Sequence, residues 1–130
     1  MIAIRALDGT EVEVNEAAVT LVAGPYPHDV GPHTYVHGVE RGLLVTAEEA
    51  AALVARLGVN PSLAKLTRPD STPVWVKGSA VSAIRSPLPT EQQPGAAVKA
   101  VLVIGDLHQA VREDVRTATS IINRTGNQPA

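Results

Sequence analysis

The residues best suited to chemistry are three histidines in the first half of the chain. His28, His33 and His37 fall within ten residues, and Asp29 stands beside the first of them. Imidazole and carboxylate groups are ligands for zinc and other transition metals. These histidines lie among prolines and glycines, however, and the matching positions of the second half hold no equivalents. The pattern favours polar loop surface over a metal site, and we predict neither a metal nor another cofactor.

A second group of titratable residues lies near the end of the chain. His108, Glu113 and Asp114 have the side chains of a general base and two orienting carboxylates, but their spacing matches no catalytic motif. The chain has no cysteine, which excludes disulfides, thiolate ligands and a cysteine nucleophile. It also has no glycine-rich phosphate-binding pattern. We therefore predict that the protein is not an enzyme and has no catalytic residues.

The chain repeats itself at a spacing of 62 positions. Nine residues of the first half recur in the second half without a gap; they are Asp8, Thr10, Val12, Val14, Ala18, Val19, Pro25, Pro27 and Pro32. A period of about half the chain indicates a tandem duplication of one small unit. Units of about 60 residues bury a modest share of their surface, so we expect the two halves to share one core.

Hydrophobic periodicity predicts the elements of the first half. Asp8-Gly9 is a hairpin turn signal between two alternating segments. Thr46 as an N-cap, with Glu49 three residues later, forms a capping box and predicts a helix over 47–57. The predicted strands of this half are 2–6, 11–15, 17–23, 34–39 and 42–45.

The second half repeats this order. Its predicted strands are 63–67, 74–76, 79–85, 98–104 and 107–111, and its predicted helix is 113–122. The sequence thus predicts an α+β fold of two tandem units, each with four to five short strands and one C-terminal helix. We place the first unit at 1–60 and the second at 61–123, packed as one pseudo-two-fold domain. Residues 124–130 form a polar tail.

Two proline-rich loops occupy equivalent places in the repeat, at 24–33 and 86–95. They exceed the usual length of hairpin connections, and their prolines reduce the entropy lost on binding. An alternative is that the prolines protect exposed strand edges, but edge protection does not require such length. We predict contact with partners through Pro25, Tyr26, Pro27, Pro32, Pro87, Leu88, Pro89 and Pro94.

The first 57 residues also carry a family pattern. It consists of alternating strands around Asp8-Gly9, a second strand ending in Asn15, a third strand at 19–22, and a last strand running into the acidic segment 44–49. This order resembles the small flagellar accessory proteins of the FlbD/SwrD type. The second half matches more loosely, through 74–76, 81–84 and 111–115. The resemblance implies a small sheet-plus-helix unit and a non-catalytic accessory role.

Charge is distributed unevenly, although the net charge is only −2. Lys and Arg number three against eight acids up to Asn60, and eight against five acids from Pro61 onward. This asymmetry would suit head-to-tail docking, or it reflects drift between diverged copies. Nucleic-acid binding usually adds aromatic stacking platforms, and Trp75 is the only tryptophan. We therefore do not expect nucleic acid as the main partner.

No membrane span is predicted, because no apolar run approaches 18 residues. No signal peptide is predicted, because the start of the chain lacks a basic region followed by an apolar stretch. We expect the protein in the cytoplasm of the producing cell or in a virion. Its predicted function is that of a non-enzymatic structural or interaction protein in a larger assembly, such as a capsid or tail accessory component of a phage, acting as a homo-oligomer or assembly subunit. The alternatives are a regulatory or nucleic-acid-binding module using the basic second half, and a histidine-dependent metal-binding protein.

Overall fold

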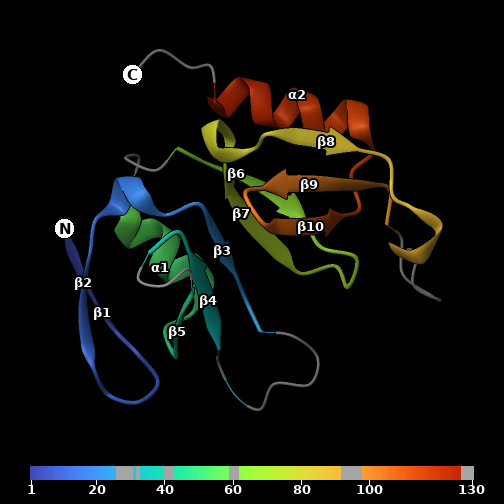
Figure 1. Cartoon of the computed structure of the whole chain (residues 1–130). Coiled ribbons are helices and arrows are strands. Elements are labelled where there is room, and N and C mark those ends of the chain that lie inside the picture. The colour runs from blue at the N-terminus through green and yellow to red at the C-terminus, as the bar shows by residue number, and fades with distance from the viewer. Residues whose placement is uncertain (26–30, 32, 40–42, 59–61, 92–97, 127–130) are drawn as a thin grey trace. The chain divides into compact units, whose positions relative to one another are not determined.

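The computed structural model describes residues 1–25, 31, 33–39, 43–58, 62–91 and 98–126. Contacts within the chain divide it into two compact units, Met1–Pro61 and Ser62–Ala130. Each unit combines short antiparallel strands with one helix that follows them (Figure 1). The α+β class predicted from the sequence is therefore confirmed.

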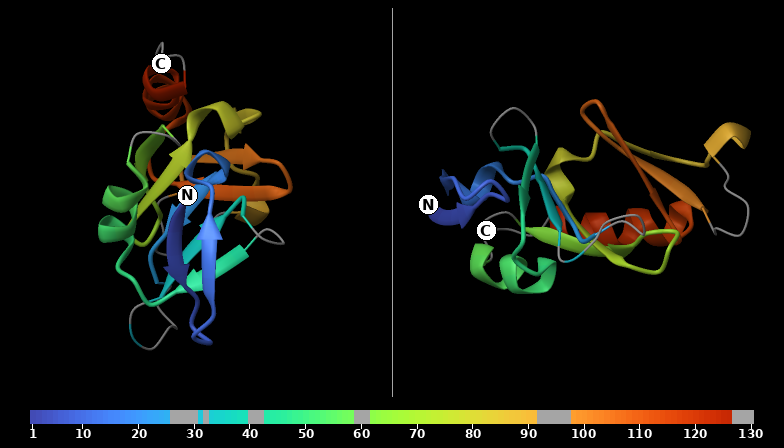
Figure 2. Two further views of the ribbon diagram at one scale, coloured as in Figure 1. Left: turned by 90° about the vertical axis from the view of Figure 1, so that its left-hand side faces the viewer. Right: turned by 90° about the horizontal axis from the view of Figure 1, so that it is seen from below.

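The first unit begins with a hairpin, and its next three strands pair in the order β5–β4–β3. The left view of Figure 2 shows the two hairpin strands side by side in blue. The elements are β1 (Ile2–Arg5), β2 (Glu11–Val14), a 3₁₀ turn (Glu16–Ala18), β3 (Leu21–Ala23), β4 (Thr34–His37), β5 (Leu43–Thr46) and α1 (Ala50–Leu57).

The second unit has the same order of elements and the same antiparallel pairs, a hairpin followed by a sheet of order β10–β9–β8. Its helix contacts β6, β8 and the 3₁₀ turn that precedes β8. The elements are β6 (Leu63–Thr67), β7 (Pro73–Lys77), a 3₁₀ turn (Gly78–Ala80), β8 (Ala83–Arg85), a second 3₁₀ turn (Pro89–Glu91), β9 (Ala100–Ile104), β10 (Leu107–Val111) and α2 (Val115–Gly126).

Backbone hydrogen bonds of the hairpin turn recur in the second unit. The N–H of Ala6 donates to the carbonyl of Thr10 at 2.8 Å, and the bond 62 positions later has the same length. The carboxylate of Asp8 accepts from the N–H of Thr10, and the matching pair 62 positions later does the same. An Asp side chain that bonds the backbone two residues on stabilises a tight turn. This explains why Asp and Thr recur in both halves.

The spacing between matching residues changes in the proline-rich loop. Val22 pairs with Val36 in the first unit, whereas Ile84, 62 positions after Val22, pairs with Leu102. Leu102 stands 66 positions after Val36, so the second loop is four residues longer. β9 begins at Ala100 rather than at Val98, and residues 92–95 of the predicted loop lie outside the described residues. The gap-free alignment of the halves does not continue past this loop.

The predicted strands at 17–23 and 79–85 are too long at their N-terminal ends. Each of these segments contains a 3₁₀ turn before β3 or β8 begins. In the first unit the side chain of Asn15 accepts from the N–H of Ala17 at 3.1 Å. A short polar side chain that satisfies a nearby N–H favours a turn over a strand. The alternating pattern alone does not reveal this competition.

Both helices begin later than predicted, and Thr46 is not an N-cap. The N-cap position of α1 is Glu49, which makes no side-chain capping bond. The hydroxyl of Thr46 instead donates to the carbonyl of Arg5 at 2.7 Å and accepts from the N–H of Glu48 at 3.3 Å. The prediction of a capping box was therefore wrong, because the Thr46 hydroxyl bonds the carbonyl at the end of β1.

The second helix extends further than predicted. Its first turn is capped by Asp114, whose carboxylate accepts from the N–H of Thr117 at 2.8 Å. It passes Asn123 and ends at Gly126, so the start of the predicted polar tail is helical. Arg124 lies in the last turn, where a cation interacts favourably with the helix dipole. Residues 127–130 lie outside the described part of the chain.

The buried side chains are almost all aliphatic, as the composition requires. In β2, Val14 is buried while Glu11 and Glu13 are exposed, which is the alternation expected of a strand with one buried face. The largest buried side chains are Ile4, Leu21, Leu53, Leu57, Leu66, Leu102, Val14, Val19, Val22, Val36, Val74 and Val76. No helix in the described residues is long and apolar enough to span a membrane.

Candidate functional site

The residues predicted to make contacts lie in the two proline-rich loops, and only some of them are described. Tyr26, Pro27, Pro32 and Pro94 lie outside the described residues. Of the rest, Pro25 is exposed and Pro87 is half-buried. Leu88 is 54% exposed, and Pro89 beside it is exposed as well. The described part of the second loop therefore presents an apolar tip to solvent.

Residues 85–91 form a closed structure that we call the clamped turn. The guanidinium of Arg85 donates to both carboxylate oxygens of Glu91, at 2.7 and 2.8 Å. The same carboxylate accepts from the N–H of Leu88 at 2.6 Å, and the N–H of Glu91 donates back to the Leu88 carbonyl at 2.9 Å. A bidentate Arg–carboxylate pair fixes geometry as well as charge. The clamp therefore holds Leu88 in place at the tip.

The electrostatics of the clamped turn agree with its geometry. The pair with Arg85, together with the N–H of Leu88, lowers the pKa of Glu91 to about 2, and the charge of nearby His108 contributes in the same direction. The hydrogen bond to Glu91 raises the pKa of Arg85. Sequence reasoning missed this pair. The usable signal was Glu91 three residues after Leu88, which is the spacing of a glutamate that bonds back to the start of a helical turn.

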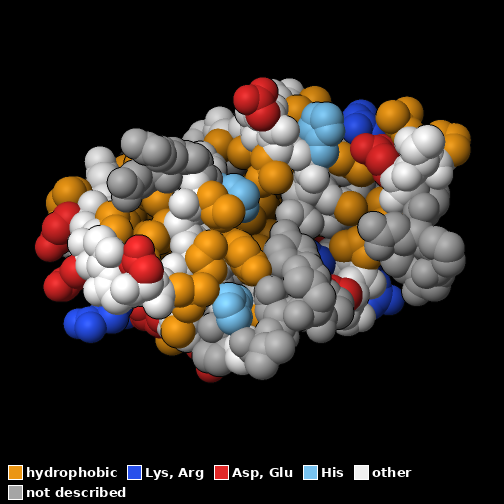
Figure 3. All heavy atoms as spheres, turned by 60° about the horizontal axis from the view of Figure 1, so that its bottom comes forward, with side chains coloured by type: hydrophobic (Ala, Val, Ile, Leu, Met, Phe, Trp, Pro, Cys, Tyr) orange, Lys and Arg blue, Asp and Glu red, His pale blue; other side chains and the backbone are white. Residues whose placement is uncertain are grey.

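The histidines of the first half are not gathered into a site in the described residues. His33 lies just before β4, where its Nδ1 is 3.3 Å from the carbonyl of Gly31, and His37 ends that strand. In Figure 3 the histidine side chains stand apart as separate pale blue patches. His28 lies outside the described residues. Within the described part of the chain, no three His, Cys, Asp or Glu residues form a group that could hold a metal ion.

The acids near His108 have structural partners. The carboxylate of Glu113 accepts from the N–H of Thr67 at 3.0 Å. Asp114 caps α2, and its bond to the N–H of Thr117 lowers the pKa of the Asp114 carboxyl. His108 is exposed on β10, where its charge acts on Glu91. Asp114 therefore serves the first turn of the helix.

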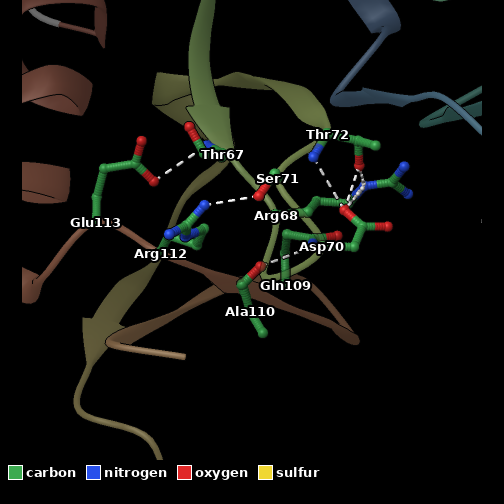
Figure 4. A network of polar contacts seen from close by, with 9 residues as sticks. All are labelled: Thr67, Arg68, Asp70, Ser71, Thr72, Gln109, Ala110, Arg112 and Glu113. Atoms are coloured by element: carbon green, nitrogen blue, oxygen red, sulfur yellow. Dashed lines mark hydrogen bonds and ion pairs between the residues drawn. The ribbon is translucent and has the colours of Figure 1, made fainter. Parts of the chain in front are cut away.

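A polar network joins the β6–β7 turn to the segment before α2 (Figure 4). Glu113 bonds Thr67, and the guanidinium of Arg112 donates to the hydroxyl of Ser71 at 2.7 Å. The N–H of Arg112 also donates to the Thr67 carbonyl at 2.8 Å. The segment between β10 and α2 is therefore tied to the first hairpin of its unit at three points.

The turn itself is organised around Arg68, which is only 2% exposed. Its Nε donates to the hydroxyl of Thr72 at 2.7 Å, and it lies 3.8 Å from the carboxylate of Asp70 (Figure 4). Buried guanidinium groups need such partners because desolvation of a charge is costly. Within the described part of the chain, Arg68 is the one charged side chain that is buried, and nothing in the local sequence pattern predicted its burial.

The place in the first unit that corresponds to the network of Arg112, Ser71, Glu113 and Thr67 is a pocket. Its volume is about 590 Å³. Its walls come from the β1–β2 hairpin, from the segment that follows β5, and from Arg56 of α1. Arg56 pairs with the carboxylate of Glu48 and also donates to the carbonyl of Ala3. Arg5 lines the pocket on the hairpin side, and Leu7, 49% exposed, lies among the lining residues.

No protein-family model, curated protein or solved structure matches the chain significantly. The resemblance to flagellar accessory proteins thus stays a prediction.

Proposed function

We propose that the chain is a non-catalytic subunit that associates with further copies of itself to build a larger assembly. The observation that carries this proposal is the clamped turn. It holds an exposed leucine and an exposed proline in a fixed conformation, and a preorganised loop loses little entropy on binding. A large apolar side chain held in this way is suited to fill a pocket on a partner and contribute much of the binding energy.

The proposal includes a duplicated architecture, in which the two units descend from one strand-rich unit with a C-terminal helix. The recurring turn bonds and the shared register of the hairpins β1–β2 and β6–β7 support this view. The repeat predicts no counterpart of the clamped turn in the first unit. Asp29, 62 positions before Glu91, is also acidic, but Ala23 stands 62 positions before Arg85 and cannot supply the guanidinium. We therefore assign the self-association contact to the second loop.

The test is the mass of the purified protein by size-exclusion chromatography with light scattering. We expect the wild type to elute as an oligomer and Leu88→Asp to shift toward the monomer. The matched control is Leu43→Asp, which places the same charge at a leucine that is 47% exposed on β5. The control should keep the mass of the wild type.

Two results would contradict the proposal. One is a wild-type protein that stays monomeric at every concentration. The other is an oligomer whose mass is unchanged by Leu88→Asp. A monomer that instead retards DNA, with an affinity that falls as salt rises, would favour the nucleic-acid-binding alternative.

A further inference from the structure

The pocket of the first unit occupies the place where the second unit has a filled, hydrogen-bonded space. β5 ends at Thr46 and β10 ends at Val111, so the next residue of each unit, Ala47 and Arg112, occupies the same place. In the hairpin turns, Gly9 matches Ser71, 62 positions later. In the second unit the side chains of Arg112 and Ser71 meet at 2.7 Å. In the first unit these two positions hold Ala47 and Gly9, which both line the pocket. The two missing side chains explain why the space is open there.

The filled space of the second unit shows which chemical group suits this place. The carboxylate of Glu113 accepts from the backbone N–H of Thr67 at 3.0 Å. The residues that match these two are Glu48 and Arg5. In the first unit the carboxylate of Glu48 pairs with Arg56 instead, so it does not take up the position that Glu113 occupies.

Strand geometry directs the backbone N–H of Arg5 toward the pocket side of the hairpin. Ala6 bonds to Thr10 across the hairpin, and bonded and non-bonded pairs alternate along an antiparallel ladder. The pair of Arg5 with Glu11 is therefore a non-bonded one, whose N–H and carbonyl point away from β2. The carbonyl of Arg5 does accept from Thr46 on that side, at 2.7 Å.

We propose that this pocket binds the α-carboxylate of a peptide C-terminus or a free amino acid with an apolar side chain. The carboxylate accepts from the N–H of Arg5 in the way that Glu113 does from Thr67, and the guanidinium of Arg5 adds a charged donor. Leu7 provides an apolar contact for the side chain of the ligand. The volume of about 590 Å³ lies in the range of small-ligand pockets. This site shares no residue with the clamped turn and does not depend on the proposed function.

Three probes that differ only in their end groups test the proposal: N-acetyl-leucine, leucine and leucinamide. The measurement is the chemical shift of the backbone amide of Arg5 during NMR titration of the full chain. We expect N-acetyl-leucine and leucine to shift this amide and leucinamide, which has no carboxylate, to leave it unmoved. Tighter binding of leucine identifies a free amino acid as the ligand, and tighter binding of N-acetyl-leucine identifies a peptide end. No shift with any probe, or an equal shift with leucinamide, overturns the proposal.

Substitutions locate the binding site. Arg5→Gln should weaken binding of N-acetyl-leucine about tenfold, the usual effect of losing a charged hydrogen bond. The control Arg116→Gln removes an exposed arginine from α2 and should leave binding unchanged.

A second variant fills the pocket in the manner of the second unit. Gly9→Ser combined with Ala47→Arg should abolish binding. A Cβ at Gly9 meets no atom within 4 Å, but the φ of 90° strains a serine at this position. Ser71, with φ of 75°, holds a serine at the matching position of the second unit. Ala47→Arg alone, at an exposed position, serves if the double variant does not fold. A folded, filled variant that binds like the wild type overturns the proposal.

Discussion

Thr46 links the end of β1 to the segment that leads into α1, and its hydroxyl can be removed without changing the shape of the side chain. In Thr46→Val, the carbonyl of Arg5 loses its donor and the N–H of Glu48 loses its acceptor. Thr46 is only 2% exposed, so water does not easily replace the hydroxyl. A lost hydrogen bond costs about 1 kcal/mol, and an unsatisfied buried partner adds to this, which gives about 1.5 kcal/mol in total.

The assay is thermal unfolding followed by circular dichroism. An unfolding entropy of about 2 cal/mol/K per residue converts 1.5 kcal/mol into a Tm about 5 °C lower for a chain of this length. The control is Thr119→Val, since the hydroxyl of Thr119 on α2 makes no hydrogen bond within the described residues; it should change stability by less than about 0.5 kcal/mol. If Thr46→Val melts together with the control, the bond to Arg5 does not stabilise the first unit and the role given to Thr46 is wrong.

Three further predictions concern the clamped turn, the polar network and the repeat. The folded-state pKa of Glu91 lies below its ordinary value of 4.5, so the clamp is complete above about pH 4.5 and is lost as the pH falls through about 2; the carboxyl ¹³C shift of Glu91 measures this, and a midpoint near 4.5 would contradict the clamp. Arg112→Leu removes the bond to Ser71 at an exposed site, and should lower the unfolding free energy by about 0.5–1.5 kcal/mol in urea titrations; no change would mean that the bond contributes nothing. The two halves expressed separately should show little protection in hydrogen exchange, because units of about 60 residues bury a modest share of their surface; full protection of either half would show that it needs no shared core.

The fold was predictable where strong local signals agreed with each other. Asp8-Gly9 between two alternating segments predicted the first hairpin, and β10 has the bounds expected from the sequence. The predicted boundaries of elements were wrong where a polar side chain forms a hydrogen bond with a residue of another element. Thr46 and Glu49 have the spacing of a capping box, but the Thr46 hydroxyl bonds Arg5, 41 residues away. A partner at that distance leaves no trace in a local pattern.

The exposure of Leu88 could be predicted from the sequence, but the clamp that holds it could not. The proline-rich loop drew attention to Leu88, and the structure shows this leucine exposed. The clamp between Arg85 and Glu91 depends on a turn whose geometry places residues six positions apart in contact, and no helical or strand periodicity produces that spacing. The pocket was likewise invisible in the sequence, since it results from two small residues, Gly9 and Ala47, that are notable only beside their matches in the second unit.

The central claim is that the clamped turn makes the contact between copies of the chain. Backbone amide spectra recorded over a dilution series test this claim most directly, because self-association shifts or broadens the signals of residues in the contact. We predict concentration-dependent changes concentrated at residues 85–91, largest at Leu88, and their disappearance in Leu88→Asp. Spectra that do not change with concentration, or changes confined to residues outside the clamped turn, would contradict the account.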